Sequence, residues 1–284
     1  MDLKTLSDVP PWEWPQDAGT EIQKVLIDNR VKASDRLIAA ELAGDLTVMN
    51  DDLAGVLLTI VRNNEEPPQL RAKAAISLGP ILEYADTDGF EEPDDVPITE
   101  STFHRLQDSL HQLHLDRSLP KEVHRRVLEA AVRAPQDWHQ KAIREAYSTG
   151  DQDWTLTAVF AMRWVRGFDD AILESLNSAQ PGIHLEAVRA AGNWQLDAAW
   201  SHIVALIEDP ATPRPLLLAA IEAVAGIRPE EAREILIDLA DSEDEEIAEA
   251  ADEALTMAEG ISDEIDFEED EDEEEFEEDD EEER

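Results

Sequence analysis

Five of the seven histidines of this chain fall within residues 104–144, and this clustering is the strongest chemical signal in the sequence. His104, Asp108 and His111 are spaced by four and three residues, which places all three on one face of a helix. Imidazole and carboxylate groups at such a spacing could hold a borderline metal. The buried stripe of the same helix is predicted to consist of Phe103, Leu106, Leu110 and Leu113. The histidines then lie beside that stripe near solvent, so we expect no metal and no other cofactor. A metal-dependent enzyme using this face is kept as an alternative.

The same segment is basic in a chain that is otherwise acidic. Residues 104–144 contain eight lysines and arginines against five acids, a local charge of +3, whereas the whole chain carries −45. One interpretation is an ordinary solvated helix face. The other is a surface that binds an acidic partner or the acidic C-terminal tail of this chain, which would then dock on 104–144. The candidate partner-binding residues of this surface are Arg105, Arg117, Arg125 and Arg126.

Two further candidate binding segments lie at the ends of the chain. Trp12 and Trp14 are bracketed by prolines, and they predict either an exposed recognition strip or a segment that covers the open end of the first repeat. Residues 262–284 hold eighteen acids and one arginine, a composition that predicts disorder. Within this tail, Phe267 and Phe276 could anchor a basic protein. Alternatively, the tail serves solubility alone.

The charge and the composition limit the class of partner. Outside the acidic tail, which carries −17, the chain still carries −28. Such a field repels nucleic acid and anionic membranes and favours a basic protein partner, although adaptation to a salt-rich cytoplasm would leave a similar composition. With no cysteine, the chain has no disulfide and no thiolate site. We also expect a cytoplasmic protein, because the N-terminus lacks the pattern of a signal peptide and the longest apolar stretch, 53–61, is too short to span a bilayer.

The elements that must position these residues are predicted by an alanine-rich pattern that recurs along the chain. It is clearest from Leu70 to Gly79 and from Ile183 to Gly192, where apolar residues line one helix face and small residues allow a neighbouring helix to approach closely. Recurrence at about thirty residues is typical of stacked helical hairpins. The predicted helix pairs are 18–30 with 34–44, 50–64 with 67–85, 99–115 with 120–134, 137–148 with 152–166, 168–177 with 181–194, 197–208 with 213–227, and 229–241 with 245–258. An acidic insertion at 86–97 interrupts the repeat.

This pattern resembles the HEAT-repeat superfamily, particularly the short bacterial HEAT-like repeats of the phycobilin-lyase type. The resemblance rests on Arg71, Ala74, Ala75, Leu78 and Gly79 and on their counterparts in the other repeats. It implies a right-handed α-solenoid of about seven HEAT-like hairpins over residues 18–258. Residues 1–17 would form an irregular cap on the first repeat, and residues 259–284 a disordered polyacidic tail.

The functions found among HEAT-like proteins give specific expectations. The deoxyhypusine hydroxylase family carries repeated His-Glu dipeptides, and this sequence contains none. The HEAT-like DNA glycosylases imply a basic surface, which the charge of −45 opposes. We therefore expect a non-enzymatic scaffold or assembly factor that binds a basic protein. A HEAT-like lyase or chaperone for a tetrapyrrole-carrying protein, and an acidic tail that serves only solubility or salt adaptation, are the alternatives.

Overall fold

The computed structural model describes residues 3–91 and 96–260, and within these ranges it is all-α without a strand. Consecutive helices pair into seven hairpins at the positions that the repeat pattern predicts, so the all-α fold of stacked hairpins is confirmed. The chain divides into two compact units, residues 1–165 and residues 166–284, which are described separately. No helix in the described ranges is both long enough and apolar enough to cross a membrane.

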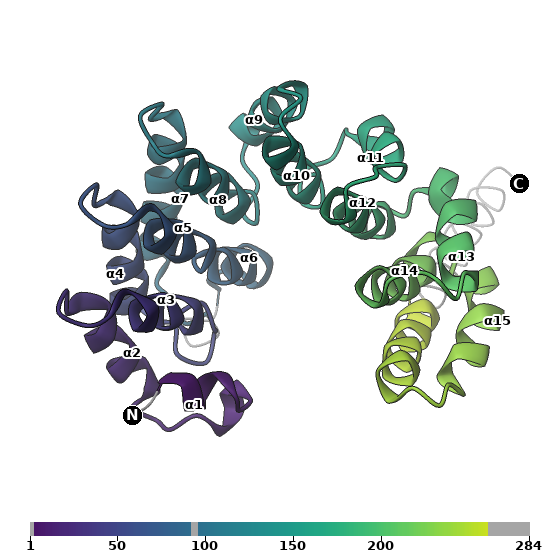
Figure 1. Ribbon diagram of the computed structural model, residues 1–284, viewed down its shortest axis with the longest axis horizontal. Coiled ribbons are helices and arrows are strands. Elements are labelled where there is room, and N and C mark those ends of the chain that lie inside the picture. The colour runs from purple at the N-terminus through teal and green to yellow at the C-terminus, as the bar shows by residue number, and fades with distance from the viewer. Residues whose placement is uncertain (1–2, 92–95, 261–284) are drawn as a thin grey trace, which may run out of the picture. The chain divides into compact units, whose positions relative to one another are not determined.

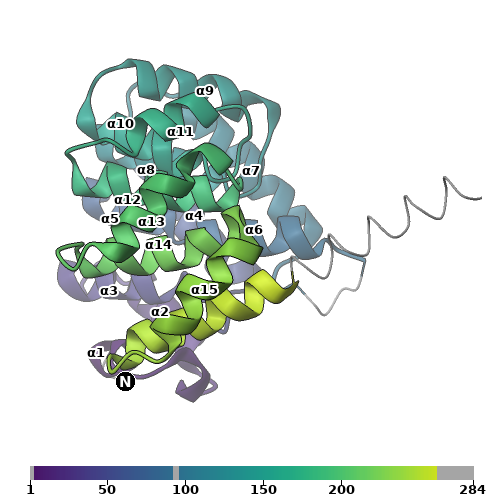
Figure 2. The ribbon, with the colours of Figure 1, turned by 90° about the vertical axis from the view of Figure 1, so that its right-hand side faces the viewer.

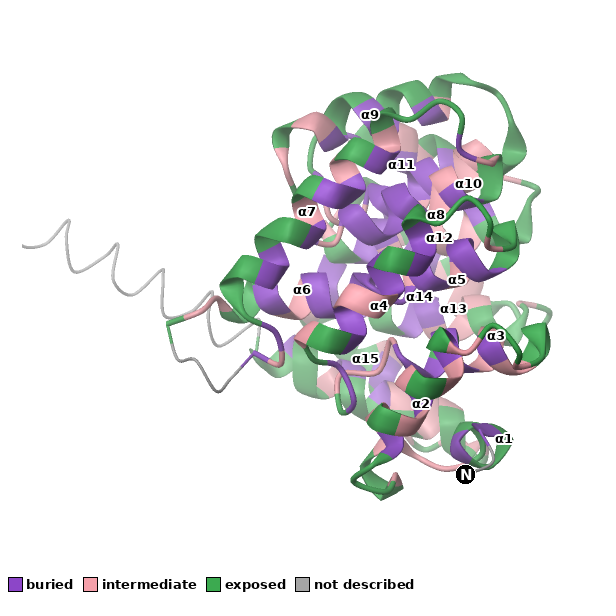
Figure 3. Ribbon diagram, turned by 90° about the vertical axis from the view of Figure 1, so that its left-hand side faces the viewer, coloured by how far each residue is buried: buried purple, intermediate pink, exposed green. Residues whose placement is uncertain are grey.

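The first unit contains four of the hairpins (Figure 1). They are α2 (Ala18–Ile27) with α3 (Ala33–Leu42), α4 (Asp51–Arg62) with α5 (Pro68–Ile76), α7 (Glu100–Leu115) with α8 (Lys121–Ala131), and α9 (Asp137–Ser148) with α10 (Gln152–Ala161). The second helix of each hairpin packs on the second helix of the next, so that α3 contacts α5, α5 contacts α8, and α8 contacts α10. The buried faces of these helices point toward one another, and their exposed faces point outward (Figure 3).

The second unit contains the other three hairpins (Figure 2). They are α11 (Asp169–Ser175) with α12 (Pro181–Asn193), α13 (Trp200–Glu208) with α14 (Arg214–Ile227), and α15 (Pro229–Ala240) with a final helix over 245–260. A short 3-10 turn, η2 (Asp197–Ala199), precedes α13. Here too the second helices pack together, with α12 lying against α14.

The structure departs from the sequence prediction at two places in the first unit. The helix expected over 67–85 is two helices, α5 and then α6 (Gly79–Asp88). The break precedes Pro80, because a proline has no amide hydrogen and its ring clashes with the carbonyl four residues earlier. At the N-terminus, the segment expected to be irregular forms α1 (Leu3–Ser7) and a 3-10 turn, η1 (Pro11–Glu13).

The N-terminal segment lies against the first hairpin through only part of its length. Helix α1 contacts α3 and buries Leu3 and Leu6. The indole nitrogen of Trp14 donates to the carbonyl oxygens of Leu6 at 3.0 Å and Val9 at 3.1 Å. Trp12, in contrast, is 80% exposed. The two tryptophans therefore have different surroundings, and only Trp12 is displayed to solvent.

The arginine of the repeat pattern caps the first helix of its own hairpin. Arg36 of α3 donates to the carbonyl oxygen of Leu26 at the end of α2, and Arg71 of α5 donates to that of Val61 near the end of α4. These carbonyls belong to the last turn of a helix, where no amide of the same helix remains to bond them. The repeated arginine is therefore a structural residue that joins the two helices of a hairpin.

The glycine that ends the pattern marks the closest approach of neighbouring hairpins. A β-carbon added to Gly192 of α12 would lie 2.6 Å from the Cα of Ala223 in α14. Gly55 of α4 is also helical, but its nearest neighbour would be an arginine nitrogen at 4.0 Å. At Gly192 the missing side chain is needed for packing, whereas at Gly55 there is room for one and glycine only lowers the helix propensity.

We expect Gly192→Ala to destabilise the protein and Gly55→Ala to stabilise it. Alanine favours a helix over glycine by about 1 kcal/mol, but overpacking costs about 1–3 kcal/mol where backbone must move, and only Gly192 is so confined. Thermal unfolding followed by circular dichroism measures both changes. Equal shifts of the midpoint in the two variants would show that the close approach at Gly192 has no energetic weight.

Candidate functional site

A hollow of about 480 Å³ lies in the first unit where the third and fourth hairpins meet. We call it the His–Trp pocket. Its lining comprises His111, His114, Leu115 and Arg117 from α7 and the turn after it, His124 from α8, Trp138, Lys141, Ala142, Glu145, Ala146 and Thr149 from α9 and its end, and Trp154 from α10. Three imidazoles and two indoles thus face one cavity, the kind of apolar, aromatic lining with a few polar groups that binds small molecules.

The aromatic rings of the pocket are in direct contact with one another. His111 stacks on Trp138 with ring centroids 4.6 Å apart and planes inclined by 6°. The imidazoles of His114 and His124 share a hydrogen bond of 3.2 Å. His124 in turn meets Trp154 edge to face, with centroids 5.2 Å apart. These contacts fix the orientation of the rings.

The inner imidazoles of this cluster are neutral at pH 7. Burial lowers the pKa of His114 to about 4, and the neighbouring charges of His124, His111 and Arg117 act in the same direction. Burial also lowers the pKa of His124. The inner wall of the pocket therefore offers uncharged hydrogen-bonding nitrogens.

His139 lies behind Trp138 and is completely buried. Its Nδ1 accepts a hydrogen bond of 2.8 Å from the amide of Gln136 at the start of α9. Its Nε2 is buried and has no hydrogen-bond partner among the residues that the structure describes. The pKa of His139 is lowered to about 3. Burial is the main cause, and the charges of His114 and His111 act in the same direction. This imidazole is a neutral part of the packing beneath the pocket.

The charged side chains of the pocket lie at its mouth. Lys141 and Glu145 are exposed and stand 3.7 Å apart on α9. Arg117 is exposed and, within the described ranges, makes no hydrogen bond and no ion pair. The pocket therefore combines an aromatic, neutral interior with one uncommitted cation at its entrance.

The predicted metal face is divided by the structure. His104 lies on the surface, 3.6 Å from Glu100 and 3.3 Å from Gln107, while His111 stacks on Trp138 in the pocket. Among the described residues, no group of three or more histidines and acids, Asp108 included, is arranged to hold a metal.

The predicted partner-binding arginines have different environments. Arg125 donates to Thr157 at 2.8 Å and pairs with Glu129, and Arg126 also pairs with Glu129. Arg105 donates to Thr102 at 3.2 Å, so of the four only Arg117 enters the pocket. Their role toward a partner stays a prediction, as does that of Trp12 and Trp14. Phe267 and Phe276 lie outside the described residues, so docking of the tail on 104–144 also stays a prediction.

The indoles of the pocket and the role of His124 were missed by sequence reasoning. Trp138 and Trp154 line the cavity, and neither is among the candidate site residues predicted from the sequence. The signal for His124 was present, because in the repeat alignment it occupies the position of the capping residues Arg36 and Arg71. His124 contacts His114, ten residues earlier, just as Arg36 contacts Leu26 and Arg71 contacts Val61, and here the two imidazoles share a hydrogen bond.

A histidine also takes the place of the repeat arginine in the second unit, but it has a different partner. His184 occupies the equivalent position in its hairpin, and its Nε2 lies 2.9 Å from that of His202. Burial lowers the pKa of both imidazoles. This pair joins α12 to α13 of the next hairpin, whereas His114 and His124 join the two helices of one hairpin.

Comparison with known proteins gives structural similarity alone. No protein-family model and no curated protein sequence matches the chain. Solved structures that match include human deoxyhypusine hydroxylase, at 19% identity and a TM-score of 0.40, covering 91% of this chain and 88% of that one. The Escherichia coli protein YibA matches at 16% identity and a TM-score of 0.42, over 87% of this chain and 84% of that one. An engineered protein matches at 17% identity and a TM-score of 0.33, over 87% of this chain and 98% of that one.

These similarities bear on one expectation from the sequence. We expected a non-enzymatic scaffold and no enzyme, with a HEAT-like lyase or chaperone and an acidic, merely solubilising tail as alternatives. The expectation of a non-enzymatic scaffold is contradicted, because one of the similar structures is that of a hydroxylase. At this identity and TM-score, no activity or site residue is transferred to this chain.

Proposed function

We propose that the His–Trp pocket of the first unit binds a small, planar aromatic anion. The observation that carries the proposal is the combination of two indoles and three imidazoles around a cavity of about 480 Å³ with Arg117 at its mouth. Aromatic side chains stack on flat rings, and a guanidinium binds carboxylate or phosphate groups through paired hydrogen bonds.

The protonation states favour binding over proton transfer. A general base acts best when its pKa lies near the working pH, and the pKa of His114 is lowered to about 4. The imidazole pair of His114 and His124 is instead suited to hydrogen-bond a polar edge of a bound ring, one nitrogen donating and another accepting. The cation that attracts the anion is then Arg117, and the imidazoles determine how the ring is oriented.

We expect the full-length protein to bind 2-naphthoate, measured by isothermal titration calorimetry. The neutral analogue naphthalene-2-methanol should bind more weakly, because it gives Arg117 no anion. Cyclohexanecarboxylate should not bind, because it cannot stack. Trp138→Leu and Arg117→Gln should each weaken 2-naphthoate binding about tenfold, the effect of losing one anchoring contact of about 1.4 kcal/mol.

The matched controls carry the same substitutions outside the pocket. Trp12→Leu removes an indole that is 80% exposed, and Arg30→Gln removes a guanidinium whose side chain is 91% exposed. Both should bind 2-naphthoate as the parent protein does. If Trp138→Leu and Trp12→Leu bound it equally, the pocket would not be the site.

Two further expectations from the sequence, the type of repeat and the cellular location, are also proposed. The chain is proposed to have repeats of the phycobilin-lyase type, supported by glycines at hairpin contacts such as Gly192 and Gly226. A cytoplasmic location is proposed because the sequence contains no cysteine.

A further inference from the structure

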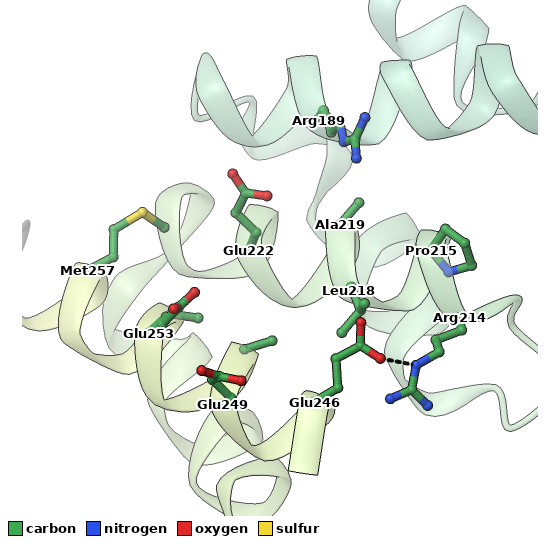
Figure 4. Close-up of a pocket in the computed structure, with 12 residues that line it drawn as sticks. Arg189, Arg214, Pro215, Leu218, Ala219, Glu222, Glu246, Glu249, Glu253 and Met257 are labelled. Carbon is green, nitrogen blue, oxygen red and sulfur yellow. Dashed lines mark hydrogen bonds and ion pairs between the residues drawn. The ribbon is translucent and has the colours of Figure 1, made fainter. Parts of the chain in front are cut away.

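A second hollow, of about 730 Å³, lies within the second unit. We call it the glutamate groove. Two helices form most of its walls, α14 and the final helix over 245–260, and Arg189 of α12 adds to its border. Figure 4 shows Glu222 of α14 and Glu253 of the final helix on neighbouring helices, with Met257 beside them.

The floor of the glutamate groove is apolar. Helix α14 contributes Pro215, Leu218 and Ala219, and the final helix contributes Ala250, Ala254 and Met257. On α14, Leu218 and Ala219 follow Pro215 by three and four residues, and on the final helix the successive intervals are four and three, so each helix presents an apolar stripe to the hollow. Met257 is 39% exposed. A groove between two such stripes is the shape that accepts the apolar face of a further helix.

The rim of the groove carries negative charge that no described residue neutralises. Glu222, Glu249 and Glu253 are exposed and make no ion pair within the described part of the chain. The two cations of the hollow are already paired with other acids, so they do not neutralise these three glutamates. Arg214 pairs with Asp244 at 2.6 Å and with Glu246, and Arg189 pairs with Glu186 at 2.9 Å.

We infer that the glutamate groove binds a basic amphipathic helix of another protein. Leucine or methionine side chains on one face of that helix would cover the apolar floor, and flanking lysines or arginines would meet Glu222, Glu249 and Glu253. The acidic tail of this chain, with eighteen acids and one arginine, has the wrong charge for the site, as does a second copy at −45. Like charge also disfavours nucleic acid and anionic lipid. The inference is independent of the proposed function, since the His–Trp pocket lies in the other unit.

The test measures binding of a synthetic eighteen-residue leucine–lysine amphipathic helix to the full-length protein by calorimetry. Glu222→Gln/Glu249→Gln/Glu253→Gln should weaken binding at least tenfold. The matched control, Glu230→Gln/Glu234→Gln/Asp238→Asn, removes the same charge from exposed positions on α15 outside the groove. It should weaken binding no more than twofold, because exposed charges at a distance are screened by salt.

Two further peptides distinguish a groove from general attraction to an acidic surface. A serine–lysine peptide with the same charge should bind at least tenfold more weakly, and a leucine–glutamate peptide should not bind. A benzophenone on the apolar face of the leucine–lysine helix should crosslink to residues 214–227 or 245–260. Equal losses in the two triple variants, equal binding of the serine–lysine peptide, or crosslinks confined to residues 261–284 would each overturn the inference.

Discussion

Replacing Glu66 with glutamine is expected to destabilise the first unit by about 3 kcal/mol, the cost of leaving a buried charge without its partner. The guanidinium of Arg36 donates two hydrogen bonds of 2.7 Å to the carboxylate of Glu66. The two side chains are only 8% and 10% exposed. Glutamine keeps the shape of glutamate but removes its charge, so Arg36 would stay buried and unpaired. Urea unfolding followed by circular dichroism measures the loss.

A double replacement separates the charge from the packing. In Arg36→Met/Glu66→Met no buried charge remains, and such exchanges are often neutral or stabilising. Arg36 also donates to the carbonyl oxygen of Leu26 at 2.8 Å, and a buried acceptor that loses its donor costs about 1–3 kcal/mol. The double variant should therefore be more stable than Glu66→Gln but less stable than the parent protein.

The matched control makes the same chemical change on the surface. Glu21 pairs with Lys24 at 2.7 Å, and the side chain of Lys24 is 65% exposed. Exposed pairs of this kind contribute little, so Glu21→Gln should leave the urea midpoint unchanged. A Glu66→Gln protein that unfolds at the same urea concentration as Glu21→Gln would refute the expectation.

The arginine at this position also shows how far the sequence predicts the fold. The recurrence of Arg36 and Arg71 with the alanines and glycines identifies the hairpins, because stacked units must repeat their contacts. The acceptor of each arginine cannot be read from that pattern, since it lies on the other helix of the hairpin. Glu66, which follows the end of α4, has no marker in the sequence to separate it from Glu65 beside it.

The pocket was only partly predictable for a similar reason. The sequence identified the histidine-rich segment 104–144, and helical spacing grouped His104 with His111. In the structure these two residues separate, because the ring of His111 meets Trp138 on α9 of the next hairpin. Helical spacing reports neighbours on one helix, whereas the pocket is formed by side chains from four helices. The boundary between the two compact units at residue 165 likewise has no glycine- or proline-rich linker.

The histidines of the pocket are expected to make the stability of the first unit fall as the pH is lowered from 6.5 to 4. The pKa of His114 is lowered from its ordinary value of 6.5 to about 4, mainly because the imidazole is buried. Over this interval the unfolded chain binds a proton at this residue and the folded chain does not, so stability falls as the pH falls. At pH 4.5 the loss of unfolding free energy due to His114 is about 2.5 kcal/mol, because each pKa unit corresponds to about 1.36 kcal/mol. Below pH 4 the contribution becomes constant.

The measurement must separate this effect from that of the acidic residues. Protonation of carboxylates also changes stability in acid, and in a chain of net charge −45 it relieves repulsion. The quantity to compare is therefore the difference in unfolding free energy between the parent protein and His114→Gln, at pH 7 and at pH 4.5. Since glutamine does not titrate, the variant should gain about 2.5 kcal/mol relative to the parent between these two values.

The control replaces a histidine that is exposed. The side chain of His104 is 62% exposed, so water surrounds it in the folded and the unfolded chain alike. His104→Gln should follow the parent protein at both pH values. An NMR titration provides a direct reading, in which the imidazole of His114 stays unprotonated at pH 5.5 and so does that of His139, whose pKa is lowered to about 3. If both imidazoles titrated near 6.5, the inner wall of the pocket would be charged in mild acid, and orientation of a ligand by neutral imidazoles would be refuted.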